Sequence, residues 1–208
     1  MLDEVSSFTL WAHLERGKAT IFGVYEPFGL GSVVRRKRPE QIALLRAIGD
    51  ADGHTVFEVT VGKDPRIPVG VISRGFAQGR DGIRIGEIRD ERAGMRRNRV
   101  FDQFGSGELL GKRPGAARLH NRRILRGVAE EGSLGALWWS PFQLFADRLQ
   151  YRSAASAGFE IRHRGSFHYC HVDIHDPRVN RLLTLSCAVD FLCRDVLPSK
   201  ALRYKIAQ

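Results

Sequence analysis

The stretch Val100-Phe101-Asp102-Gln103-Phe104-Gly105 contains an apolar run, then an acidic residue, then a glycine three positions later, and a second apolar run follows from residue 108. The same order occurs in residues 24–29 and again, less regularly, in residues 47–53. An acidic side chain can accept hydrogen bonds from turn amides, and glycine adopts the positive φ that closes a tight turn. The repeat therefore predicts a series of β-hairpins along one chain.

The segments between these motifs favour further strands. Residues 55–61 alternate between apolar and polar side chains, which is typical of a strand with one buried face. We interpret residues 19–34 as the first complete hairpin, residues 75–82 as a glycine-rich turn and residues 92–99 as a basic connection. Further strands are predicted in residues 5–14, 42–48, 69–72, 83–88, 159–161 and 167–174.

The C-terminal part of the chain has a different pattern. Asp176 suits a helix N-cap and Pro177 suits the first helical turn, which predicts a helix over about residues 177–196. Its apolar residues cover nearly the whole circumference, so the helix must lie inside protein or inside a membrane. The uncharged stretch, residues 182–189, is too short to span about 30 Å of hydrocarbon. We therefore expect one all-β domain over residues 1–208, in which a closed antiparallel barrel surrounds this buried helix.

These motifs resemble those of the tubby C-terminal-like superfamily, in particular the branch of phospholipid scramblases and LURP-one-related proteins. The resemblance rests on residues 24–29, on residues 100–105 with Leu110-Gly111-Lys112, and on the run from Asp176 through Leu183 to Asp190. It extends over roughly residues 8–197, and the order of the motifs together with the terminal helix is more specific than any one of them.

The resemblance implies a twelve-stranded antiparallel barrel around a central helix. In tubby proteins this fold binds phosphoinositides through basic surface residues, and in scramblases it is associated with lipid movement and Ca²⁺. Residues 173–176 of this chain lack the alternating acidic series and distal Glu that a Ca²⁺ loop requires, so the Ca²⁺ dependence of the family is not carried over to this chain.

The composition agrees with an anionic ligand. The chain has 208 residues and a formal net charge of +10, which favours nucleic acid, anionic lipid or an acidic protein as partner. Arginine forks pair well with phosphate oxygens. We predict a primary anion-binding run and a secondary one, whose members are Arg35, Arg36, Lys37 and Arg38 in the first and Arg96, Arg97 and Arg99 in the second.

Other residues with potential chemistry have weaker patterns. His171, Asp173 and His175 share one face of a predicted strand, but the two histidines are about 13 Å apart, which is too far for one metal ion. Cys187 and Cys193 lie in the apolar helix, where cysteine packs as a small hydrophobe and has no neighbouring base. We therefore predict no catalytic residue, no metal and no cofactor.

The sequence thus predicts a non-enzymatic protein that binds phospholipid or phosphoinositide headgroups at a membrane surface. The sparse cysteines and the acidic start without a signal peptide favour a cytoplasmic protein that associates peripherally with the membrane. No segment has the length of a membrane span. The alternatives are a nucleic-acid-binding domain, a protein-interaction domain that uses Trp138 and Trp139, and scramblase-like lipid translocation.

Overall fold

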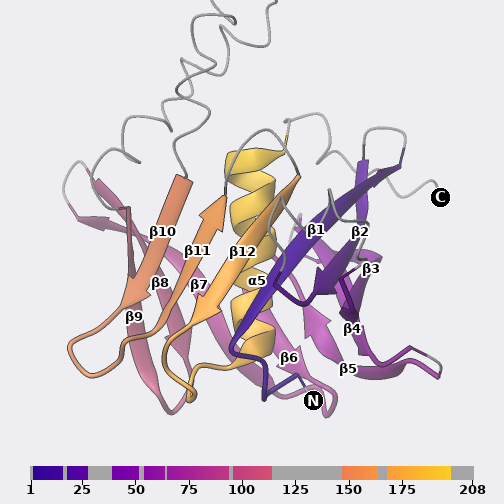
Figure 1. The fold of residues 1–208 in the computed structure, drawn as a ribbon. Helices are drawn as coiled ribbons and strands as arrows, with labels where there is room; N and C mark the ends of the chain where they lie inside the picture. The colour runs from indigo at the N-terminus through magenta and orange to yellow at the C-terminus, as the bar shows by residue number, and fades with distance from the viewer. Residues whose placement is uncertain are drawn as a thin grey trace, which may run out of the picture.

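The computed structural model describes residues 2–15, 18–27, 39–51, 54–63, 65–93, 96–113, 147–163 and 168–197. In these ranges twelve antiparallel strands form a closed barrel around one helix, as predicted (Figure 1). Each strand pairs with its neighbours in the sequence, and β1 pairs with β12 to close the barrel. The strands are β1 (Ser7–Glu15), β2 (Lys18–Tyr25), β3 (Gln41–Ala51), β4 (His54–Val61), β5 (Ile67–Ile72), β6 (Phe76–Gly79), β7 (Arg84–Ala93), β8 (Arg96–Gln103), β9 (Gly107–Lys112), β10 (Asp147–Arg152), β11 (Phe159–His163) and β12 (Tyr169–Ile174).

Alternation of side chains along each strand fills the interior of the barrel. In β4, Phe57, Val59 and Val61 are buried, whereas the residues between them are partly exposed. The inward side chains from many strands then form one apolar core. In this core the rings of Tyr151 and Phe159 stack at 4.6 Å. Burying each large apolar side chain contributes about 1.5–3 kcal/mol, so this shared core is the main force that holds the barrel around its helix.

The central helix consists of α5 (Arg181–Phe191) and a π-helical turn, η1 (Leu192–Val196). Every residue of α5 is buried, which confirms the prediction of a helix inside protein. The predicted start was wrong by four residues. Asn180, not Asp176, is the N-cap, and its side chain accepts hydrogen bonds from the amides of Leu182 and Leu183 at 2.9 and 3.2 Å. Asp176 precedes the helix and binds Arg178 instead.

The hairpin prediction is confirmed for the copy of the motif at residues 100–105. For the copy at residues 47–53, the two predicted strands are present and pair with each other. Strands β8 and β9 are joined by a turn in which the Ser106 amide donates to the Gln103 carbonyl at 3.0 Å, and Gly105 has a φ of 80°. The acidic residue of this copy does not bind the turn amides as expected. The Asp102 carboxylate instead accepts a hydrogen bond from Arg89 on β7 at 3.2 Å, so it ties two strands together.

Two other local predictions were wrong. Strand β6 occupies part of the predicted glycine-rich turn, and β8 begins inside the predicted basic connection. Long-range pairing around a closed barrel explains both errors, because it requires strands where the local pattern favours a turn or a loop. The first arm of the hairpin predicted over residues 19–34 is β2, which pairs with β1 and β3, and the predicted return arm lies outside the described residues.

The antiparallel meander places the connections alternately at two ends of the barrel (Figure 1). We call the end at which β12 finishes and α5 begins the helix-start end. It carries the connections β2–β3, β4–β5, β6–β7, β8–β9 and β10–β11. We call the other end the helix-finish end, and it carries the remaining hairpin connections and the end of η1.

Candidate functional site: the helix-start end of the barrel

Three exposed, large apolar side chains lie in, or directly next to, hairpin connections of the helix-start end. Ile67 lies just after the β4–β5 connection, Ile83 in the β6–β7 turn and Phe104 in the β8–β9 turn, and they are 49%, 67% and 51% exposed. Single exposed apolar residues are ordinary, but a group of them at one end, rimmed by polar residues, marks a protein or membrane contact.

The backbone holds these apolar side chains in defined positions. The Ile83 amide donates to the Asp81 carboxylate at 3.0 Å, and the Ile83 carbonyl accepts from the Gly79 amide at 2.9 Å. The Phe104 amide donates to the Ile85 carbonyl at 3.0 Å, which fastens the β8–β9 turn to β7. Tight turns with this bonding present their apolar side chains to solvent as a fixed feature of the fold.

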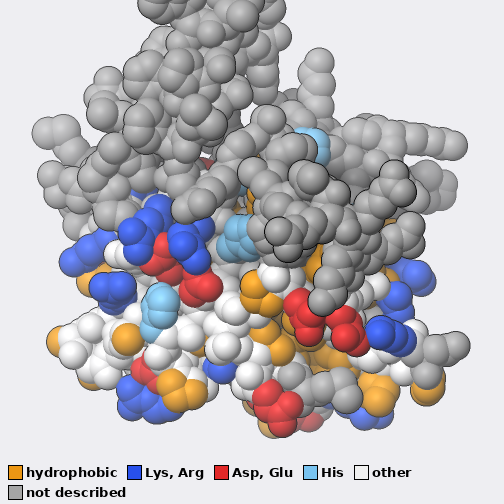
Figure 2. Space-filling model, viewed as in Figure 1, with side chains coloured by type: hydrophobic (Ala, Val, Ile, Leu, Met, Phe, Trp, Pro, Cys, Tyr) orange, Lys and Arg blue, Asp and Glu red, His pale blue; other side chains and the backbone are white. Residues whose placement is uncertain are grey.

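Basic side chains flank the apolar ones. Arg66 and Arg80 are exposed at this end, and no described carboxylate pairs with either of them. Arg84 is half-exposed and pairs with Glu87 at 3.2 Å. Along the lower rim in Figure 2, hydrophobic and basic side chains lie next to each other. The helix-start end thus combines apolar contact area with unpaired positive charge.

The barrel wall is different, because its charges compensate one another. Arg148 pairs with Glu160 at 2.5 Å, and Arg162 pairs with Asp173 on the neighbouring strand. Basic and acidic side chains lie together on this face (Figure 2). Across the described ranges Lys and Arg barely outnumber Asp and Glu, so almost all of the excess positive charge belongs to residues outside those ranges.

The predicted basic residues are described only in part. The primary run, Arg35, Arg36, Lys37 and Arg38, lies outside the described residues. The end of β2 and the start of β3, which flank this run in the sequence, meet at the helix-start end, where the Glu26 amide donates to the Glu40 carbonyl at 2.9 Å.

The secondary run belongs to the helix-finish end. Arg96 and Arg97 are the first residues of β8, next to the β7–β8 connection. The Arg99 side chain is only 12% exposed and pairs with Asp90 at 3.4 Å and with the buried Asp190. Internal carboxylates therefore occupy the Arg99 guanidinium, so Arg99 is not available to an external anion as predicted.

Asp190 is the centre of a buried charge cluster at the helix-finish end. Its side chain has no exposed surface, and its carboxylate accepts hydrogen bonds from Nε of Arg74 at 3.1 Å and pairs with Nε of Arg194 at 2.9 Å. Arg194 also donates to Asp90 at 2.8 Å. The cluster links α5 and η1 to three strands or turns of the wall, so we assign it a structural role.

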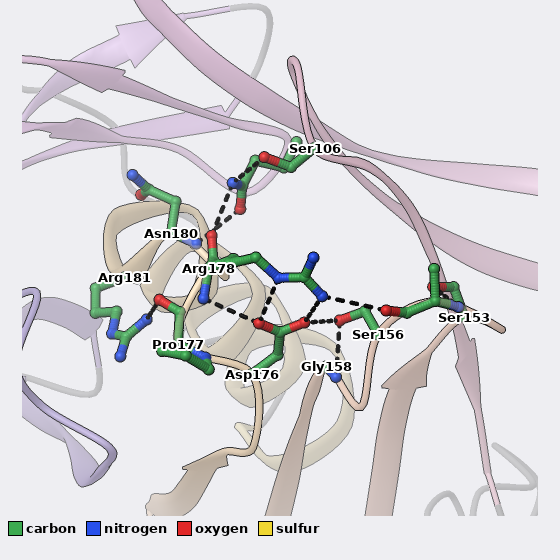
Figure 3. A network of polar contacts seen from close by, with 11 residues as sticks. Ser106, Ser153, Ser156, Gly158, Asp176, Pro177, Arg178, Asn180 and Arg181 are labelled. Atoms are coloured by element: carbon green, nitrogen blue, oxygen red, sulfur yellow. Dashed lines mark hydrogen bonds and ion pairs between the residues drawn. The ribbon is translucent and has the colours of Figure 1, made fainter.

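A small cavity lies beside the Phe104 turn at the helix-start end. It has a volume of about 260 Å³ and is lined by the β8–β9 turn, the β10–β11 connection and the segment that precedes α5. Asp176 lies in its wall and accepts hydrogen bonds from Arg178 Nε at 3.0 Å, from Arg178 Nη2 at 2.8 Å and from the Ser156 hydroxyl at 2.5 Å (Figure 3). The hydrogen bonds from Arg178 and Ser156 hold the pKa of Asp176 well below its usual range.

The other predicted features have no such arrangement. The histidine-rich strand, β12, turns Cys170 and Val172 inward as predicted, and His171 lies outside, within 2.8 Å of the Thr9 hydroxyl. No group of three or more metal-ligating side chains occurs in the described part of the chain. Burial raises the pKa of the Cys187 thiol to about 12 and that of Cys193 to about 11, as expected for packed thiols that are not nucleophiles.

The sequence analysis missed the apolar tips and the cavity. The signal for Ile83 was an Asp-Gly turn followed directly by a large apolar residue, and the signal for Phe104 was an aromatic residue inside a turn that is otherwise polar. Both signals can be recognised from a few neighbouring residues of the sequence. Trp138 and Trp139, which the protein-interaction alternative would use, lie outside the described residues.

Searches of family models, curated proteins and solved structures found no match to this chain. Among the described residues, no helix has both the length and the apolar character needed to cross a membrane.

Proposed function

We propose that this chain is a non-enzymatic, tubby-like barrel protein that binds anionic phospholipid or phosphoinositide headgroups with its helix-start end against the cytoplasmic surface of a membrane. The observation that carries the proposal is the group of three exposed apolar side chains at one end, Ile67 at the start of β5 and Ile83 and Phe104 in turns. Arg66 and Arg80 at the same end supply attraction to anionic lipid, and we propose that residues 35–38, which lie between β2 and β3 in the sequence, add to it.

The basic side chains contribute about twice as much as the apolar ones. A fully buried Ile or Phe side chain contributes about 1.5–3 kcal/mol, so three that are half-exposed in water add about 3 kcal/mol when they enter the interface. A Lys or Arg close to an anionic surface adds about 1 kcal/mol. Arg66, Arg80 and the four residues 35–38 therefore provide about 6 kcal/mol before the costs of association. This balance is typical of reversible, salt-sensitive peripheral binding.

The architecture also supports the proposal. The resemblance to the tubby-like superfamily implies a twelve-stranded barrel around a central helix, and the fold has this arrangement. The proposal needs no membrane span, since the barrel would touch the lipid with its turns. It does not require lipid translocation, and scramblase-like activity is not part of it.

Vesicle co-sedimentation at two ionic strengths tests the proposal. Neutral vesicles are compared with vesicles that contain phosphatidylserine or a phosphoinositide, and we expect binding only to the anionic ones, weakened by salt. Replacing Ile83 and Phe104 by Ser should weaken this binding roughly 30-fold, from about 1 kcal/mol for each side chain. Neutralising residues 35–38 should reduce the salt dependence as well as the affinity.

The barrel wall offers a matched control. Ile48 and Leu110 are also exposed, at 55% and 37%, but they lie on the strands β3 and β9. Replacing both by Ser should leave vesicle binding unchanged. Equal losses in the two double variants would contradict the proposed orientation. Failure to bind any vesicle, together with salt-dependent binding to DNA, would favour the nucleic-acid alternative.

A further inference from the structure

In the cavity beside the Phe104 turn, the one carboxylate of the lining is fully occupied by hydrogen bonds from neighbouring residues. Asp176 uses both carboxylate oxygens: Oδ1 accepts from the Arg178 amide and Nε, both at 3.0 Å, and Oδ2 accepts from Arg178 Nη2 and the Ser156 hydroxyl. Nearby carbonyls are used too, since the Ala155 carbonyl accepts from Arg178 Nη2 at 3.1 Å and the Arg178 carbonyl accepts from Gln103 at 3.0 Å.

Three donors in the same wall remain available. Arg178 is 70% exposed, and none of the described residues accepts a hydrogen bond from its Nη1. The Ser106 oxygen accepts from Gln103 Nε2 at 2.9 Å, which leaves its O–H free to donate. The Ser153 oxygen likewise accepts from the Ala155 amide at 3.3 Å, and its O–H is free. A cavity whose acceptors are occupied and whose donors are not is suited to an oxyanion.

Asp176 orients the guanidinium that such an oxyanion would meet. Its two oxygens take the Nε and Nη2 side of the Arg178 fork, so the remaining edge, with Nη1, is directed away from the carboxylate (Figure 3). The same contacts compensate the negative charge of Asp176. Ser106 lies between Gly105 and Gly107, and a Cβ at either glycine would have no neighbour within 4 Å, so the space beside the Ser106 hydroxyl is open.

We propose that this cavity binds a single phosphate group through Arg178 Nη1 and the hydroxyls of Ser106 and Ser153. Its volume of about 260 Å³ is below the usual size of pockets for drug-sized ligands and fits a phosphate with its ester carbon atoms. The phosphate can belong to a lipid headgroup or to a free phosphate ester. That the phosphate comes from a lipid rests on the proposed function, because the cavity adjoins Phe104 at the end that would face the membrane. Binding of a phosphate group as such is independent of the proposed function.

An NMR titration of the full chain with inorganic phosphate and with glycerol phosphate tests the site. We expect chemical-shift changes that saturate at the amides of Ser106, Ser153 and Arg178, and that are absent with sodium chloride at equal ionic strength. In the double variant Ser106→Ala and Ser153→Ala, affinity for glycerol phosphate should fall at least about tenfold, because hydrogen bonds to a charged group are lost. Gln103 keeps its bonds to Arg178 and Asn180 in this variant, so the turn should stay folded.

A matched charge control uses Arg152, which is exposed next to Ser153 and has no described carboxylate partner. Arg152→Gln should retain the phosphate response, whereas Arg178→Gln should abolish it. An equal loss in both variants would overturn the site in favour of general electrostatic attraction. No saturable shift with either phosphate compound would overturn it directly.

The same variants separate this inference from the proposed function. If the cavity variant loses glycerol phosphate and also loses part of its vesicle binding, the phosphate comes from lipid. If it loses glycerol phosphate while the wild-type protein binds no vesicle, the site exists for a soluble phosphate ester and the membrane proposal fails. If vesicles bind normally and phosphate compounds do not, the membrane proposal stands and the cavity site is refuted.

Discussion

Replacing Asp190 by Asn should destabilise the protein strongly although the two side chains have nearly the same shape. The Asp190 side chain is fully buried and faces three guanidinium groups, of which Arg74 and Arg99 are only 21% and 12% exposed. The variant removes the one negative charge that these buried arginines share. Breaking a buried ion pair by removing one partner costs about 3–5 kcal/mol, because the remaining charge is left without compensation.

The effect is measurable by urea unfolding and by thermal melting. A loss of about 3–5 kcal/mol is a large part of the 5–15 kcal/mol typical of a folded domain. For a chain of this length it should lower Tm by about 6–20 °C. The urea m-value should stay unchanged, since the surface exposed on unfolding is the same.

A nearby carboxylate provides the control for this prediction. Asp90 also binds Arg99 and Arg194, but its side chain is 32% exposed, and exposed pairs contribute about 0–1 kcal/mol. Asp90→Asn should therefore cost less than about 1 kcal/mol. If Asp190→Asn cost no more than Asp90→Asn, the assignment of a buried, structurally required charge at the helix-finish end would be refuted. Vesicle binding of the folded Asp190→Asn protein should remain intact, because the change lies at the opposite end.

Gly86→Ala should lower the free energy of unfolding, measured with urea, by at least about 1–3 kcal/mol, because the new Cβ would lie 2.7 Å from Leu183 Cδ2 and against the backbone of β8. Gly49→Ala is the control and should be close to neutral, because the space around its Cβ is open. The folded-state pKa of Asp176 lies below its unfolded value, so its stabilising contribution should be complete above about pH 4 and disappear as the pH falls through the folded-state pKa. Asp176→Asn should remove this part of the dependence of unfolding free energy on acidic pH. The same dependence in the wild type and the variant would refute the contribution. The Cys187 thiol, whose pKa burial raises to about 12, should not react with a thiol reagent at pH 8 until urea unfolds the chain, and rapid labelling of the native protein would contradict its burial.

The sequence pattern predicted the architecture well because each part of it has a local signature. The apolar circumference of residues 182–189 indicated a helix inside protein, and a single buried helix among hairpins requires strands on all sides. The helix start was wrong because Asp176 and Asn180 are both good caps. Only the tertiary contact of Asp176 with Arg178 and Ser156 decides between them.

The candidate site was predicted only in part, for a similar reason. The run Arg35 to Arg38 can be recognised in the sequence, but the sequence does not show which carboxylates pair with a given arginine. Nothing in the sequence distinguishes Arg99, which turns inward to Asp190, from Arg66, which has no described carboxylate partner. The cavity is still less visible, since its wall combines residues from three connections that are brought together only when the barrel closes.

The order of the elements has a consequence for how the chain acquires its structure during synthesis. Strand β1 leaves the ribosome first, and its partner on one side, β12, is made more than 150 residues later, as the contact between Thr9 and His171 illustrates. The helix that fills the interior follows β12 and is made later still. Until then the nascent strands have an open edge and an apolar face without a core, which is the condition under which β proteins aggregate or require chaperones. Joining the two termini and opening the chain between β9 and β10 would make β1, β12 and α5 neighbours in synthesis. Since β9 and β10 would then close the barrel last, the yield of folded protein from this permutant would measure how much the late synthesis of the central helix costs the cell.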